Sequence, residues 1–215
     1  MTVSISRRRF TAGEMVATLK TPALRMPPRR LWRMTRAKYE VLVQKGAFGP
    51  DDRVELLDGL LIVREPPGSR HAVTVDLVIA ELERAFGEGY YVRGDKPLAL
   101  DDVSEPEPDV AVVRGHPRDY LDAHPATPAL IVEVADTSLA EDRLRKGGLY
   151  ARAGIGDYWI VNLVDDVLEV YRRPERAPSR RFGWQYGSMR LLRRGAVISP
   201  LAAPRTRIRV AALLP

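Results

Sequence analysis

The chain has 215 residues, of which 45% are hydrophobic and 29% are charged, which suits one globular domain with its own core. It contains no cysteine, so disulfides and thiolate metal sites are excluded. The arginines at positions 7, 8 and 9 precede no apolar leader segment, and no stretch approaches the roughly 20 apolar residues of a membrane span. We therefore expect a cytoplasmic protein without a membrane partner.

The net charge of +6 is unevenly distributed along the chain. Residues 1–36 carry +8 and residues 172–215 carry +10, which leaves −12 for the centre. An acidic centre with basic ends suits an enzyme that holds a cation between carboxylates and meets phosphates at its periphery. The alternative is that the arginines only maintain solubility. Prolines at 22, 27 and 28 favour disorder in the first 30 residues.

The first half of the chain predicts a helix, a hairpin, a long helix and a strand. Thr35 can cap a helix that runs to about Lys45. Asp58-Gly59 is a strong signal for a two-residue hairpin turn. Alternation and helical spacing of apolar residues predict the remaining elements, which are strands at 53–57 and 60–64, a helix at 69–86 and a strand at 90–93.

Two short apolar runs each carry one acidic residue. Asp109 precedes the run 110–113, and Glu133 interrupts a second run between Val132 and Val134. Burying a carboxylate is costly unless it is compensated, and a bound divalent cation is a common compensation. Side chains alternate along a strand, so Glu133 faces away from both valines. If the two strands pair, both carboxylates converge on one ion, with the backbone carbonyl near Val134 as a third hard-oxygen ligand.

The second half predicts one more helix and several strands. Ser138 and Glu141 form a capping-box pattern that starts a helix, which Gly154 can end. Alternation predicts strands at 158–163, 167–171, 182–186, 189–192 and 208–210. This order of elements is typical of an α/β or α+β fold with a mixed central β-sheet flanked by helices.

Taken together, several segments between about Met34 and Arg173 resemble a known family. They are Val54 to Gly59, His71, Ser104 to Val110, Val132 to Asp136, Asp142, Lys146, Tyr150, Ala153 to Ile155 and Asp157 to Val161. The chain resembles the Uma-two (Uma2) family of restriction-endonuclease-like proteins in the PD-(D/E)XK nuclease superfamily. The resemblance implies an endonuclease that hydrolyses DNA phosphodiester bonds with Mg²⁺, for which Mn²⁺ can substitute.

The resemblance also implies a division of the chain and a set of metal ligands. Residues 31–173 would form the nuclease core, between a basic, proline-containing segment at 1–30 and an arginine- and proline-rich extension at 174–215. That extension would contain short strands packed on the core. Asp109 and Glu133 would hold Mg²⁺ together with the Val134 carbonyl, and Glu55 would be the third carboxylate. The alternative for Glu55 is a hairpin residue that faces water.

One departure from the superfamily pattern concerns its lysine. The pattern places a lysine two residues after the second acid, and here that position is Ala135. The resemblance implies that Lys146 takes over from a helix, orienting and helping to deprotonate the attacking water and offsetting charge on the phosphate. Gly147 and Gly148 support a close approach there. The alternative is a solvated lysine paired with Asp142.

Four further side chains are candidates for the surroundings of the site, namely His71, Glu107, Asp136 and Asp142. His71 either touches the site or a phosphate, or is a structural histidine. Asp136 and Asp142 are either outer acids of the site or charges favoured at a helix start. Glu107 either lines the cleft or solubilises an extended loop. The aromatic residues Tyr150, Tyr158 and Trp159 are expected in the core.

Three functions remain open from the sequence. The first is the DNA endonuclease, with DNA as the partner and a homodimer allowed. The second is a catalytically inactive nucleic-acid-binding or regulatory module with the same fold. The third is a metal-dependent phosphohydrolase that acts on small molecules, which would leave the basic ends unexplained.

Overall fold

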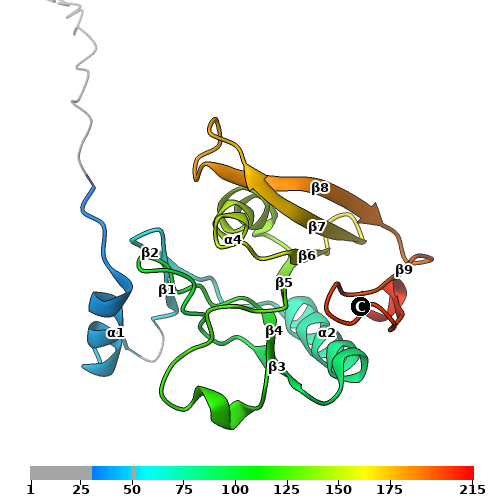
Figure 1. Ribbon diagram of the computed structural model, residues 1–215, viewed down its shortest axis with the longest axis horizontal. Coiled ribbons are helices and arrows are strands. Elements are labelled where there is room, and N and C mark those ends of the chain that lie inside the picture. Colours follow the sequence, from blue (N-terminus) through cyan, green and yellow to red (C-terminus); the bar gives the residue numbers. More distant parts are fainter. Residues whose placement is uncertain (1–30, 50–51) are drawn as a thin grey trace, which may run out of the picture. The chain divides into compact units, whose positions relative to one another are not determined.

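A six-stranded mixed sheet with helices on both faces forms the centre of the chain (Figure 1). The computed structural model describes residues 31–49 and 52–215, and Trp32–Pro215 is one compact unit. The α/β (α+β) architecture expected from the sequence is confirmed. The basic, proline-containing segment at 1–30, with its expected disorder, lies outside the described residues.

The sheet has the strand order β3-β4-β5-β6-β7-β8. Its strands are β3 (Tyr90–Gly94), β4 (Val110–Arg114), β5 (Leu130–Ala135), β6 (Asp157–Asn162), β7 (Val167–Arg176) and β8 (Trp184–Leu192). Neighbouring strands are antiparallel except for β5 and β6, which are parallel. A parallel pair needs a crossover connection, and here a helical segment between the two strands supplies it.

That crossover is one of several helical segments. The α-helices are α1 (Arg36–Gln44), α2 (Ser69–Phe86), α3 (Leu139–Glu141) and α4 (Gly147–Arg152), with a π-helical turn, η2 (Asp142–Lys146), between α3 and α4. Smaller elements are the strands β1 (Val54–Leu57), β2 (Leu60–Val63), β9 (Val197–Ile198) and β10 (Ile208–Arg209) and the 3₁₀ turns η1 (Pro117–Tyr120) and η3 (Val210–Ala212). Within the described ranges, every helix is too short or too polar to cross a membrane.

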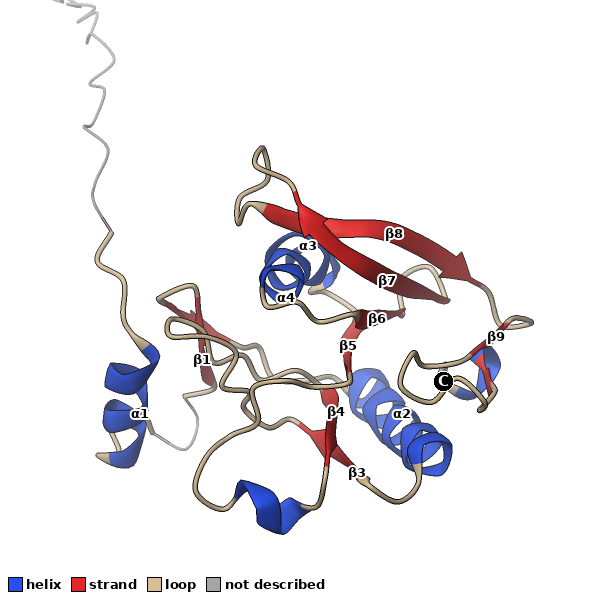
Figure 2. Cartoon of the chain, in the orientation of Figure 1, coloured by secondary structure: helices blue, strands red, loops and turns tan. Residues whose placement is uncertain are grey.

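The two faces of the sheet pack against different partners (Figure 2). On β5, Val132 and Val134 join one core cluster with the apolar face of α2. Ile131 and Ala135 join a second cluster with residues of α4. Glu133 has the same parity as the second pair, so it points to the α4 face, as the alternation predicted. The candidate acid therefore lies beneath the crossover helix.

The β1–β2 hairpin is held close to the loop that leads into β4. Its turn residues Asp58 and Gly59 have φ angles of +51° and +77°, the left-handed pair that a tight two-residue hairpin requires. The Leu56 N–H donates to the Glu105 carbonyl, and the Glu105 N–H donates back to Leu56 at 2.7 Å. These bonds bring Glu55 of β1 next to the segment before Asp109.

Two details of the predicted elements are wrong. Ser138 does not cap a helix, because its backbone is already helical and its hydroxyl donates to Asp142 Oδ2 at 2.6 Å. The segments 182–186 and 189–192 are parts of one strand, because β7 extends to Arg176 and pairs along nearly the whole of β8. Local alternation could not show how far the partner strand continues. The other predicted strands and helices are present, with most ends shifted by one or two residues; β7 continues five residues beyond the predicted end, and a π-turn interrupts the predicted crossover helix.

Asp157 at the start of β6 is a buried junction between three segments. It has no exposed surface, and it accepts bonds from Arg172 Nε, Trp159 Nε1 and the Leu201 N–H, each at 2.8 Å. We expect Asp157→Ala to lower the free energy of unfolding by about 3–5 kcal/mol, because it leaves the buried Trp159 N–H unpaired and takes the carboxylate away from the largely buried Arg172 guanidinium. Urea denaturation measures this.

The control is Glu81→Ala, which removes a surface ion pair with Arg84 on α2. It should cost less than about 1 kcal/mol. Equal losses in the two variants would contradict the special role of Asp157.

Candidate active site

Asp109 and Glu133 meet where β4 and β5 begin to diverge. The antiparallel register pairs Val110 with Val132, so one further step places Asp109 opposite Glu133. The Asp109 N–H points to Glu133 Oε2 at 3.4 Å, and the Val134 N–H donates to Asp109 Oδ2 at 2.7 Å. Both side chains are almost completely buried, with exposed fractions of 4% and 1%. The sequence analysis left open whether these two strands pair, and the structure shows that β4 and β5 do so.

Glu133 is also held from the crossover helix. Lys146 Nζ donates to Glu133 Oε1 at 3.1 Å, and the Tyr150 hydroxyl donates to the same oxygen at 2.7 Å. Lys146 is 6% exposed, so the expected alternative of a solvated lysine is wrong. Its ammonium still lies 3.9 Å from Asp142 Oδ1, and the pairing with Asp142 is therefore part of the same cluster.

The π-helical turn brings these side chains to one face. Asp142, Lys146 and Tyr150 follow each other at intervals of four, which places them in a row along the helix. The Gly147 N–H donates to the carbonyl of Asp142, five residues back. A Cβ at Gly147 would lie 3.2 Å from that carbonyl oxygen, so glycine permits the turn to close tightly. π-turns of this kind occur often at functional sites.

Glu55 reaches the cluster from the hairpin. Its Oε1 lies 3.8 Å from Lys146 Nζ, and its Oε2 accepts the Glu107 N–H at 2.9 Å. The side chain is 2% exposed, so the alternative of a hairpin residue facing water is wrong. Four separate segments therefore contribute acids to one buried cluster, which consists of Glu55, Asp109, Glu133 and Asp142.

A second cation, Arg64 at the end of the β1–β2 hairpin, faces Asp109. One of its terminal nitrogens lies 3.1 Å from Asp109 Oδ1, and the other lies 3.2 Å from Glu107 Oε2. His71 Nε2 lies 3.4 Å from the same Asp109 oxygen. His71 and Glu107 thus lie beside the cluster, whereas Asp136 is exposed and has no contact with it among the described interactions.

Comparison with known proteins identifies the family. A family model described as "Putative restriction endonuclease" (Uma2) matches residues 37–210. The chain belongs to the Uma2 family. A similar solved structure is a crystal structure of "a putative nuclease belonging to DUF820 from Anabaena variabilis", with a TM-score of 0.57, 14% identity, and coverage of 80% of this chain and 96% of that one. At this identity the likeness shows the fold alone, and it confirms the restriction-endonuclease-like core. None of the curated proteins matches.

Burial and mutual repulsion shift the acids of this Uma2 cluster. Burial raises the pKa of Glu133 to about 8; the charge of Lys146 opposes this shift, and that of Asp109 adds to it. Burial likewise raises the pKa of Asp142 to about 6 against the charge of Lys146. Burial would also raise the pKa of Asp109, but the hydrogen bond from His71 and the charge of Lys146 outweigh it, and the pKa falls below its ordinary value.

Lys146 responds in the opposite sense. Burial alone would lower its pKa, but the carboxylates of Glu133, Glu55 and Asp142 raise the pKa above the ordinary lysine value. Lys146 is therefore a fixed positive charge between acids. The hydrogen bond to Asp109 raises the pKa of His71 in the same way.

The donor set fits a hard divalent cation. Four buried carboxyl groups lie around the Lys146 ammonium, with Arg64 as the second nearby cation, so negative charge is in excess. Oxygen donors are those that Mg²⁺ and Mn²⁺ prefer. In the described ranges, no three acidic or histidine side chains already stand at ligating positions. Asp109 and Glu133 are instead bonded to protein cations and N–H groups.

The sequence analysis did not predict two residues that contact the acids of the cluster, Arg64 and Tyr150. Arg64 is one polar residue after an apolar strand, and only the tertiary fold shows that it contacts Asp109. Tyr150 was expected as a core aromatic and is fully buried, but its hydroxyl also bonds to Glu133. Its position four residues after Lys146 was the available signal, because it predicts a shared helix face.

Proposed function

We propose that this Uma2 protein is a metal-dependent endonuclease that hydrolyses phosphodiester bonds in DNA. The observation that carries the proposal is the buried cluster in which Asp109 and Glu133 lie side by side while Lys146 reaches Glu133 from a helix. Such an arrangement is too costly to bury as a purely structural feature without a compensating gain. Perturbed acids grouped in this way are typical of functional sites.

In the proposed reaction, a water oxygen attacks phosphorus and gives up a proton to solvent, the P–O bond to the leaving oxygen breaks, and the leaving oxygen takes up a proton from solvent. Lys146 would orient the attacking water and offset negative charge on the phosphate, because it is held as a cation by three carboxylates. Tyr150 would fix the orientation of Glu133. Glu55 would act beside Lys146, directly or through water.

Asp109, Glu133 and the Val134 carbonyl would hold Mg²⁺, with Mn²⁺ as a substitute. The Val134 N–H points at Asp109, and in a strand the carbonyl of a residue points to the same side as its N–H. When bound, the ion would supply Lewis-acid stabilisation of the phosphate and a more acidic water.

The proposed partner is DNA, and the basic ends of the chain would contact its phosphates. Residues 31–173 would be the catalytic core, with residues 1–30 and 174–215 as basic extensions. Sedimentation of the purified chain would show whether it forms the homodimer that we propose as an assembly state.

Supercoiled plasmid provides the direct test. We expect the purified protein to convert it to nicked and linear forms with Mg²⁺ or Mn²⁺ and to leave it intact with EDTA. Gel electrophoresis reports both results, and an RNA of the same sequence in parallel tests the preference for DNA. Activity that persists in EDTA would contradict the metal dependence.

Two observations favour a second candidate, a nucleic-acid-binding module without cleavage. Ala135 occupies the position of the superfamily lysine, and Arg64 already neutralises Asp109. DNA binding without nicking under every metal condition would support this module over the nuclease.

A further inference from the structure

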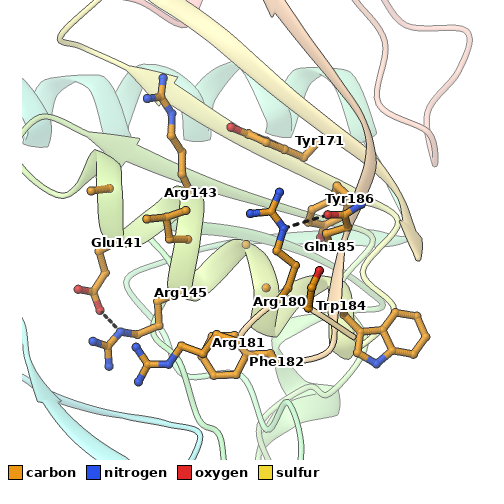
Figure 3. Close-up of a pocket in the computed structure, with 15 residues that line it drawn as sticks. Glu141, Arg143, Arg145, Tyr171, Arg180, Arg181, Phe182, Trp184, Gln185 and Tyr186 are labelled. Atoms are coloured by element: carbon orange, nitrogen blue, oxygen red, sulfur yellow. Dashed lines mark hydrogen bonds and ion pairs between the residues drawn. The ribbon is translucent and has the colours of Figure 1, made fainter. Parts of the chain in front are cut away.

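A basic cavity of about 760 Å³ lies between the crossover helix and the β7–β8 hairpin (Figure 3). Four arginines and four aromatic residues line it; those that matter for binding are Arg143, Arg145, Arg180, Arg181, Phe182 and Trp184. The volume is that of a typical ligand pocket. A volume of this size can hold about one or two nucleotide units.

The cavity is separate from the candidate active site. Asp142, Lys146 and Tyr150 turn one face of the crossover helix towards the carboxylates. Arg143, Arg145 and Gly148 belong to the same segment but line the cavity on its other side. A ligand in the cavity would therefore contact the helix that presents Lys146 without contacting the cluster itself.

Positive charge dominates the cavity wall. Arg143 is anchored by the fully buried Glu169, whose Oε2 lies 3.0 Å from Arg143 Nε. The Arg180 guanidinium donates to a neutral amide, that of Gln185, at 3.1 Å. Within the described part of the chain, neither Arg180 nor Arg181 forms an ion pair with a carboxylate. Two guanidinium groups thus remain available for an anion, and guanidinium geometry matches phosphate oxygens.

Trp184 is the aromatic ring that can receive a base, because Phe182 is packed on the crossover helix between Arg181 and Arg152. Phe182 and Trp184 are partly exposed; the Arg181 guanidinium lies 5.3 Å from the Phe182 ring centre and that of Arg176 lies 5.2 Å from the Trp184 ring centre. A Cβ at Gly148 would lie 2.8 Å from the Phe182 ring, so this glycine lets the ring settle on the helix. Proteins that bind single-stranded nucleic acids commonly combine arginines, which contact the phosphates, with aromatic rings, on which the bases stack.

We infer that this cavity binds a single-stranded segment of nucleic acid, with phosphates on Arg180 and Arg181 and an unpaired base against Trp184. A duplex keeps its bases stacked inside and cannot offer them to this ring. The inference rests on the proposed function, to which it adds a second binding site and a preference for unpaired strands. A nuclease with such a site would favour DNA with a single-stranded region near the cut.

The test measures binding of a labelled 12-nucleotide thymidine strand by fluorescence anisotropy, on the full chain in EDTA so that cleavage does not interfere. Arg180→Gln combined with Arg181→Gln should weaken binding by about 10-fold or more, because two phosphate contacts are lost. Trp184→Ala should also weaken it by about 10-fold, as expected for one stacked base. The matched control, Arg84→Gln with Arg118→Gln, removes the same charge from exposed positions outside both the cavity and the basic ends of the chain and should change affinity less than about 2-fold.

Each other outcome overturns the inference. Equal losses in the cavity and control variants would mean that only net charge matters. Duplex bound as tightly as the single strand, with the same sensitivity to Trp184→Ala, would remove the preference for unpaired bases. Thymidine monophosphate that binds as tightly as the strand would make the occupant a free nucleotide. Thermal melting of each variant confirms that it is folded, and Arg181→Gln alone serves if the double variant is not.

The same measurements separate this inference from the proposed nuclease activity. If the cavity variants lose strand binding but the wild-type protein never nicks plasmid, the cavity stands and the nuclease proposal fails. If the wild-type protein nicks plasmid and the cavity variants bind strands normally, the nuclease proposal stands and the inference about the cavity fails.

Discussion

Asp109→Asn is expected to weaken the binding of Mg²⁺ and Mn²⁺ by about 10-fold or more and to abolish detectable plasmid nicking. The asparagine amide keeps the shape of the side chain and can still accept the Val134 N–H, but it carries no charge for a cation. Glu133→Gln should act in the same direction. Isothermal titration calorimetry measures the affinity directly, independently of cleavage.

The fold should survive both substitutions, because each amide keeps the shape of the acid it replaces and can still accept a hydrogen bond. The attraction that is lost to Arg64 or Lys146 is offset by weaker repulsion among the remaining carboxylates. Asp166→Asn is the control: this exposed acid pairs with Arg194 far from the cluster, and metal affinity should be unchanged. Undiminished metal affinity in both Asp109→Asn and Glu133→Gln would show that the metal, if bound, lies elsewhere.

Local patterns predicted the parts of the fold that depend on neighbours in sequence. The Asp58-Gly59 turn, the long helix α2 and the alternating face of β5 all follow from the conformational needs of a few adjacent residues. Glu133 could be assigned to one face of its strand for the same reason. The partner across the strand, Asp109, was also within reach, because two strands joined by a polar excursion commonly pair.

Interactions set by the tertiary fold could not be predicted in the same way. Arg64 contacts Asp109 from 45 positions away, and no local pattern distinguishes it from the other arginines of a basic protein. The π-turn at 142–146 has no sequence signature of its own, although the glycine that closes it was visible. The paired glycines were interpreted as a close approach of backbones. In fact Gly148 meets the Phe182 ring, which belongs to a hairpin loop far along the chain.

Lys146→Met tests whether the role of the superfamily lysine has moved from position 135 to the crossover helix. Methionine retains the unbranched buried stem and removes only the ammonium group. We expect the cleavage rate to fall by about 10²-fold or more, as for the loss of an acid-base or charge-stabilising group. Metal affinity should stay nearly intact, because Lys146 is not a ligand. Nicking kinetics and calorimetry on the same preparation separate the two effects.

Adding a lysine at Ala135 in the Lys146→Met background completes the test. Ala135 is two residues after Glu133 and packs on the same face of the sheet, beside Tyr150 and Leu149 of the crossover helix, so a side chain there enters the space around the cluster from the strand. Partial recovery of cleavage would show that one positive charge is required at one point, whichever backbone position supplies it. Lys146→Ala serves as a second reference that removes the whole stem. If Lys146→Met and Lys146→Ala both cleave at the wild-type rate, Lys146 only compensates buried acids, and its pairing with Asp142 is the better account.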